Sequence, residues 1–121
     1  METTEENAFI VRGGAPLKGD VQLSGAKNVA LKVLIAALLL DHPVTFKNIP
    51  HLSDIDEQMH LMRKLGAKAD FVAEHDVLVD GSSLSLHEVD LLHGSKIRTS
   101  FMLFAPLLYK FGKAVIPKSL L

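Results

Sequence analysis

The sequence contains no cysteine among its 121 residues, almost no net charge and no long uninterrupted apolar run. The lack of cysteine excludes disulfide bonds, thiolate metal sites and a cysteine nucleophile within the chain. Lysine and arginine number 13 against 14 acidic residues, so no overall field attracts nucleic acid or an anionic membrane. Any recognition through charge must therefore be local.

Neither a membrane span nor nucleic-acid binding is expected. The longest apolar stretch, Val29–Leu40, contains Lys32 and falls short of the roughly 20 residues that a bilayer span requires. Residues 1–7 are acidic and polar, unlike a secretory signal, and are expected to form a disordered tail. A single tyrosine, Tyr109, offers little for stacking on bases. We expect a soluble, cytoplasmic protein.

The spacing of apolar and turn residues predicts a βαβαββ unit over residues 19–80. Ser53 followed by Asp56 resembles a capping box that opens the second helix, and Gly66 is expected to end it. A separate strand is predicted at residues 8–12. The predicted strands of the unit cover residues 19–23, 44–49, 67–72 and 76–80, and its helices cover residues 26–40 and 53–66.

An offset of 69 residues aligns part of the chain with itself, which indicates an internal repeat. The aligned pairs are Leu23 with Leu92, Gly25 with Gly94, Lys27 with Lys96, Leu34 with Leu103, Ala36 with Ala105, Leu38 with Leu107 and Leu39 with Leu108. A second, incomplete unit is therefore predicted over residues 89–117. It lacks a second helix and two strands, so we expect a truncated chain with uncovered apolar faces.

The distribution of apolar residues predicts an α/β (α+β) fold with buried helices and outer sheets. Val29–Leu40 is apolar on nearly every side, which predicts an enclosed helix. The strands alternate apolar and polar residues, which predicts sheets with one wet face. Pro106 within the second unit's helix predicts a kink there.

Cations stand where helices begin, at Lys27, Lys96 and Arg98. A lysine in a helix's first turn opposes the macrodipole at a cost of about 0.3–1 kcal/mol, whereas a bound anion reverses that effect. A phosphate or carboxylate ligand would suit this position, and the amide of Asn28 can donate to it. Solvated surface lysines with no ligand are the alternative.

Three short motifs carry a resemblance to a known family. They are Ser-Gly-Ala-Lys-Asn at 24–28, Asn-Ile-Pro at 48–50 and Leu-Gly-Ala at 65–67. Together they resemble the N-terminal quarter to third of the UDP-N-acetylglucosamine 1-carboxyvinyltransferase family, over about residues 9–117. The sister family, 5-enolpyruvylshikimate-3-phosphate synthase, is the alternative, although it usually carries Gly-Ser-Lys-Ser at the first motif.

The resemblance implies an inside-out α/β barrel of repeated βαβαββ units, with residues 8–121 as the N-terminal part of one domain. It implies transfer of enolpyruvyl from phosphoenolpyruvate to UDP-N-acetylglucosamine in peptidoglycan biosynthesis, without a cofactor or a metal. Lys27 and Asn28 match residues that bind phosphoenolpyruvate, and Arg98 matches one that binds the UDP-sugar.

The family's general-acid loop has no counterpart after Pro117, so the resemblance assigns no catalytic residue to this chain. We therefore expect the isolated chain to be inactive. Six histidines, at 42, 51, 60, 75, 87 and 93, show no metal-ligand spacing. A different possibility is a non-catalytic α/β module that self-associates through an uncovered strand edge near Ala114–Pro117.

Overall fold

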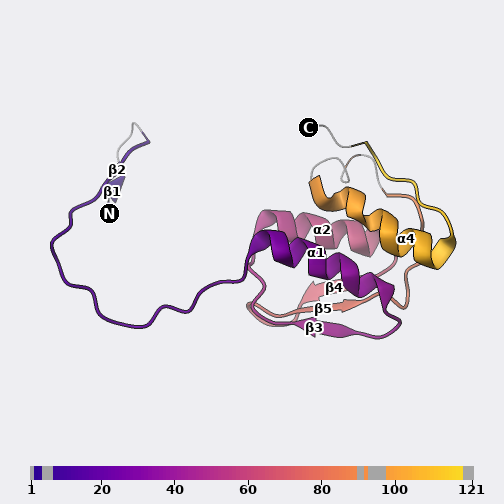
Figure 1. Cartoon of the computed structure of the whole chain (residues 1–121), viewed down its shortest axis with the longest axis horizontal. Helices are drawn as coiled ribbons and strands as arrows, with labels where there is room; N and C mark the ends of the chain where they lie inside the picture. The colour runs from indigo at the N-terminus through magenta and orange to yellow at the C-terminus, as the bar shows by residue number, and fades with distance from the viewer. Residues whose placement is uncertain (1, 4–6, 90–91, 93–97, 119–121) are drawn as a thin grey trace.

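The computed structural model describes residues 2–3, 7–89, 92 and 98–118. In these ranges helices cover one face of a three-stranded sheet, and an extended N-terminal segment runs away from this body (Figure 1). No helix in the described ranges is long and apolar enough to cross a membrane. The main elements are α1 (Lys27–Ala36), β3 (Val44–Phe46), α2 (Ser53–Lys64), β4 (Lys68–Phe71), β5 (Val77–Asp80) and α4 (Phe104–Phe111).

Helix α1 buries one stripe of its surface. Leu31, Leu34 and Ile35 are at most 4% exposed, and the chain continues as the 3₁₀ helix η1 (Ala37–Leu39). The predicted helix is confirmed, but its complete enclosure is not, because Val29 is 59% exposed. Within the described residues, neighbouring elements pack against only one side of α1.

Helix α2 begins one residue earlier than the predicted capping box allows. Ser53 is the first helical residue and Leu52 occupies the N-cap position without a side-chain cap, so the capping-box prediction is wrong. At the other end the predicted stop is confirmed. Gly66 adopts φ of 105° and the Ala67 N–H donates to the Met62 carbonyl at 3.1 Å, which is a Schellman ending.

The sheet is antiparallel with the order β3-β5-β4. Val77 and Val79 on β5 and Ala69 on β4 are fully buried, while the residues that alternate with them are more exposed. This pattern confirms the prediction of a sheet with one covered and one wet face. The helices lie on the covered side (Figure 1).

The N-terminal segment differs from its prediction. Residues 19–23 form no strand, and Val21 is 85% exposed, because no described strand lies alongside them. The strand predicted at 8–12 shortens to β2 (Phe9–Ile10), which pairs antiparallel with β1 (Glu2–Thr3). Residues 1–7, expected to be a disordered tail, therefore contain a short strand.

The second unit keeps the burial pattern of the first. Leu34 and its repeat partner Leu103 are both fully buried, and so are Leu38 and Leu107. Matched burial at matched positions indicates that the repeat reflects packing as well as leucine content. The structure therefore supports the predicted α/β fold of repeated units.

Pro106 does not sit inside a long helix as predicted. The chain forms a 3₁₀ helix, η2 (Arg98–Leu103), and then α4, in which Pro106 is the third residue. A proline in the first turn of an α-helix removes no hydrogen bond within that helix, so Pro106 is tolerated at this position. The strand edge predicted near Ala114–Pro117 is reduced to an isolated parallel bridge between Glu88 and Val115.

The carboxylate of Asp80, at the end of β5, is expected to make a pH-dependent contribution to the stability of the fold through the turn that follows. The Ser82 hydroxyl and the Ser82 N–H donate to its Oδ1 at 2.7 and 3.0 Å, which lowers the pKa of Asp80. A lowered pKa in the folded state stabilises the fold above the unfolded-state pKa, and this contribution is lost as pH falls through the folded-state pKa.

Replacement Ser82→Ala should raise the Asp80 pKa part of the way toward its ordinary value, because the backbone N–H remains. A carboxyl NMR titration measures this change. Ser83→Ala is the matched control, since the Ser83 hydroxyl donates to the Gly66 carbonyl instead. An unchanged Asp80 titration in Ser82→Ala would show that the hydroxyl bond does not control this carboxylate.

Candidate functional site

Lys27 is the first residue of α1, as the sequence predicts, and it has an anionic partner. Its Nζ lies 3.1 Å from Oδ2 of Asp54, a residue in the first turn of α2. Both side chains are a little under half exposed. The carboxylate offsets the unfavourable meeting of a lysine with the positive end of a helix. The structure thus places a cation, a carboxylate and two helix N-termini at one end of the helical layer.

The beginnings of the helices gather at this end. Figure 1 shows α1 and α4 running in the same direction, and α1 contacts η2, which precedes α4. The Lys27–Asp54 pair brings the start of α2 to the same place. Four or so free backbone N–H groups at each helix start point toward this end, which favours a negatively charged ligand.

The three predicted site residues are described to different extents. Asn28 follows Lys27 in α1 and is exposed. Arg98 begins η2, an element that contacts α1, although its side chain is not described. Lys96, the predicted repeat partner of Lys27, lies outside the described residues. The structure therefore places Lys27 and Asn28 at the start of α1 and Arg98 at the start of η2, which contacts α1.

The turn before Lys27 is held by a close backbone contact. A Cβ atom on Gly25 would collide with the Asn48 carbonyl oxygen, so only glycine allows the two segments to approach this closely. Asn48 adopts φ of 60°, and its side-chain amide donates to the Leu23 carbonyl at 3.4 Å. The first two motifs of the sequence therefore form one structural unit that supports the start of α1.

A second contact fixes the distance between α1 and α2. The buried Gln58 side chain donates through Nε2 to the Leu31 carbonyl at 2.7 Å. This bond joins the helices one turn beyond the Lys27–Asp54 pair. The starts of α1 and α2 are therefore joined by two contacts, the exposed Lys27–Asp54 ion pair and the buried Gln58–Leu31 hydrogen bond.

Sequence analysis missed the partners of the predicted residues. From the sequence, Asp54 is an acid of the kind common in the first turn of a helix. Only the packing of α2 beside α1 places its carboxylate next to Lys27. Asn48 belongs to a motif, but no local pattern indicates that its carbonyl meets Gly25. The available signal was the joint presence of two motifs about 20 residues apart.

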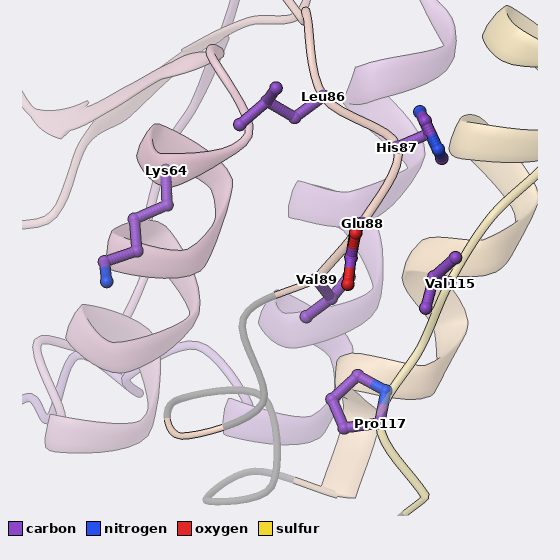
Figure 2. Close-up of a pocket in the computed structure, with 7 residues that line it drawn as sticks. All are labelled: Lys64, Leu86, His87, Glu88, Val89, Val115 and Pro117. Atoms are coloured by element: carbon purple, nitrogen blue, oxygen red, sulfur yellow. The ribbon is translucent and has the colours of Figure 1, made fainter.

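An open pocket of about 820 Å³ lies elsewhere in the molecule (Figure 2). It is lined by Lys64, Leu86, His87, Glu88, Val89, Val115 and Pro117. Lys27 and Asn28 are not among these residues, and Lys64 is the last residue of α2, at the opposite end from Asp54. The pocket and the predicted anion site are therefore separate features.

Comparison of the sequence with known proteins agrees with the family resemblance that the motifs indicate. The family model described as EPSP synthase (3-phosphoshikimate 1-carboxyvinyltransferase) matches residues 11–117. The chain belongs to this family. The match includes the predicted site residues and both units of the repeat.

Relatives within the family are more specific in name. The chain is 40% identical over 109 residues to UDP-N-acetylglucosamine 1-carboxyvinyltransferase 3 of Caldanaerobacter subterraneus subsp. tengcongensis, covering 90% of this chain and 26% of that protein. It is 37% identical to the UDP-N-acetylglucosamine 1-carboxyvinyltransferase of Bradyrhizobium diazoefficiens, covering 90% of this chain and 25% of the relative. These relatives confirm the resemblance that the motifs indicate.

A solved structure supports the fold of this family member. The enolpyruvyl transferase NikO from Streptomyces tendae matches with a TM-score of 0.71 and 28% identity, over 83% of this chain and 23% of NikO. The chain therefore spans about a quarter of the length of the family members that it matches. The helices and sheet described above correspond to part of an enolpyruvyl transferase fold.

Proposed function

We propose that this chain supplies part of the substrate site of an enolpyruvyl transferase that acts on phosphoenolpyruvate and UDP-N-acetylglucosamine. The reaction transfers enolpyruvyl to the sugar 3′-hydroxyl by addition, followed by elimination of phosphate. The place of this reaction is the cytoplasmic stage of peptidoglycan biosynthesis. The relatives named for this reaction, at up to 40% identity, support the proposal.

Lys27 and Asn28 bind phosphoenolpyruvate in this proposal. Lys27 Nζ offers three N–H donors, of which Asp54 occupies one direction at 3.1 Å, so the others remain able to hold an anionic group. Its charge stabilises the phosphate as negative charge develops on the leaving group. The Asn28 amide, next in the helix and exposed, donates to the same anion. Arg98 binds the UDP-sugar.

The single observation that carries the proposal is the position of Lys27. It is held at the start of α1 by Asp54, and the glycine turn beneath it fits only because Gly25 lacks a side chain. A lysine fixed at a helix start is suited to an anionic substrate. The proposal assigns no general acid to the residues of this chain.

A chimera tests this function directly. The N-terminal segment of the Caldanaerobacter relative that aligns with this chain is replaced by residues 9–117, and phosphate release is measured with both substrates. We expect turnover with phosphoenolpyruvate and UDP-N-acetylglucosamine, and none above background from the 121-residue chain alone. A folded but inactive chimera would contradict the proposal, and release by the isolated chain would contradict the expected need for further residues.

A second acceptor follows from the description of the family model, which names 3-phosphoshikimate. The same chimera should therefore be assayed with 3-phosphoshikimate in place of the UDP-sugar. Preference for 3-phosphoshikimate would assign the chain to the sister reaction. We expect preference for the UDP-sugar, since the relatives of highest identity described above carry that substrate in their names.

A further inference from the structure

We propose that Lys110 is a positioning residue that fixes the second unit of the repeat against the first, and so sets where Arg98 stands relative to Lys27. Lys110 lies in the last turn of α4, whereas Lys27 begins α1. This role rests on the proposed function, in which Lys27 binds phosphoenolpyruvate and Arg98 binds the UDP-sugar. Lys110 is assigned no contact with either substrate.

The ammonium group of Lys110 is held by oxygen atoms of the first unit. Its Nζ donates to the Gly81 carbonyl at 2.6 Å and to the Leu40 carbonyl at 3.4 Å, and it lies 3.4 Å from Oδ1 of Asp41. The Lys110 side chain is 13% exposed, and a cation this enclosed is costly unless it is paired and hydrogen-bonded. Because Asp41 is 89% exposed, its ion pair contributes less than the short bond to Gly81.

The oxygen atoms that hold Lys110 belong to a tightly packed corner of the first unit. A Cβ atom on Gly81 would stand 2.9 Å from the Cα atom of Leu38, so the turn after β5 lies directly against η1. Both β5 and α4 contact η1. Lys110 therefore attaches the end of α4 to a part of the first unit that has little room to move.

Apolar packing holds α4 on the helical layer but does not by itself fix its place along the helix axis. Leu103, Pro106 and Leu107 are fully buried. Their burial is non-directional, whereas the short hydrogen bond from Lys110 requires one distance and one direction. Residues 98–103 form η2 and lead into α4 without a break, so a fixed α4 also fixes the backbone of Arg98 beside α1 (Figure 1).

The repeat supports a contact between units. The 69-residue offset that defines the repeat aligns Asp41 with Lys110, so the ion pair joins matched positions that carry opposite charges. If both units carried lysine here, like charges would meet. The difference in sign at this one matched position therefore favours the pairing of the two units.

The chimera described above tests this role through the two Michaelis constants. Lys110→Met nearly keeps the length of the side chain but removes its charge and its N–H donors. We expect KM for the UDP-sugar to rise about tenfold and kcat to fall, because Arg98 moves with α4, while KM for phosphoenolpyruvate changes by less than about twofold. Equal rises in both constants, or no change in either, would overturn the proposal.

Lys113→Met is the matched control. It removes the same charge from an exposed position just beyond α4, so both Michaelis constants should stay at the parent values. A rise in KM for the UDP-sugar equal to that of Lys110→Met would assign the effect to overall charge and overturn the proposal. If Lys110→Met does not fold, Lys110→Gln takes its place with the same expected split, since it keeps a polar group at the site.

A distance measurement on the 121-residue chain tests the same role without turnover. The chain has no cysteine, so Lys32→Cys on α1 and Tyr109→Cys on α4 place nitroxide labels at two exposed positions. We expect the distance distribution from double electron–electron resonance to broaden or shift when Lys110→Met is added, and to stay unchanged when Lys113→Met is added.

The two measurements separate this role from the proposed function. A distance distribution that Lys110→Met leaves unchanged would overturn the positioning role, whatever the activity of the chimera. A parent chimera without turnover would contradict the proposed function, and the labelled chain would still decide whether Lys110 fixes α4 against the first unit.

Discussion

Replacement of Lys27 by alanine is expected to lower the turnover of the chimeric enzyme by about 10²–10³-fold, the usual effect of removing one preorganised charge-stabilising donor. Lys27 stands at the start of α1 with its Nζ held 3.1 Å from Asp54, so the loss removes an oriented cation from the proposed phosphate site. Phosphate release with both substrates measures the effect. The folded fraction, followed by circular dichroism, should not change.

Lys32→Ala is the matched control for this experiment. Lys32 lies on the same helix and is exposed, but it stands more than a turn beyond the helix start. Its loss removes the same charge without touching the proposed site, so turnover should remain near that of the parent chimera. Equal losses in both variants would show that Lys27 acts only through overall charge, and an active Lys27→Ala chimera would remove it from the phosphate site.

Replacement of Gly25 by alanine is expected to destabilise the isolated chain by about 1–3 kcal/mol, the usual cost of forcing an extra group into a packed site. The new methyl group would collide with the Asn48 carbonyl oxygen. Either the turn before α1 or the loop after β3 must move. Urea unfolding followed by circular dichroism measures the change.

Gly13→Ala separates the collision from the general effect of replacing glycine. No atom lies within 4 Å of a Cβ built on Gly13, so stability should change by less than about 0.5 kcal/mol. In the chimera, Gly25→Ala should also reduce turnover, since the displaced turn carries Lys27. Gly25→Ala with parent stability would mean that the contact with Asn48 is not close in solution.

The helices could be predicted well from local sequence patterns. The helix at α1 and the glycine ending of α2 depend on residues within a few positions of one another, and both predictions are confirmed. The capping-box prediction failed because the helix begins at Ser53 itself, one residue before the box requires. Leu52, an apolar residue with no capping group, takes the N-cap position instead of Ser53.

The strand at residues 19–23 shows the limit of such patterns. Alternation of apolar and polar residues indicates that a segment can pair, but pairing also requires a neighbouring edge. In the described structure that edge is not beside the segment, and Val21 remains 85% exposed. The same limit applies to Val29, which is apolar yet 59% exposed on α1.

The amino-acid sequence alone determined the repeat, the helix positions, the family motifs and the presence of Lys27 and Asn28 at the start of α1. The helix positions depend on residues that are near in the chain, and the repeat and the motifs depend on residue order alone. Only the tertiary structure decided that Asp54 pairs with Lys27 and that Gly25 closes against Asn48, since these partners are more than 20 positions apart. Their meeting depends on how α2 and the loop after β3 pack beside α1.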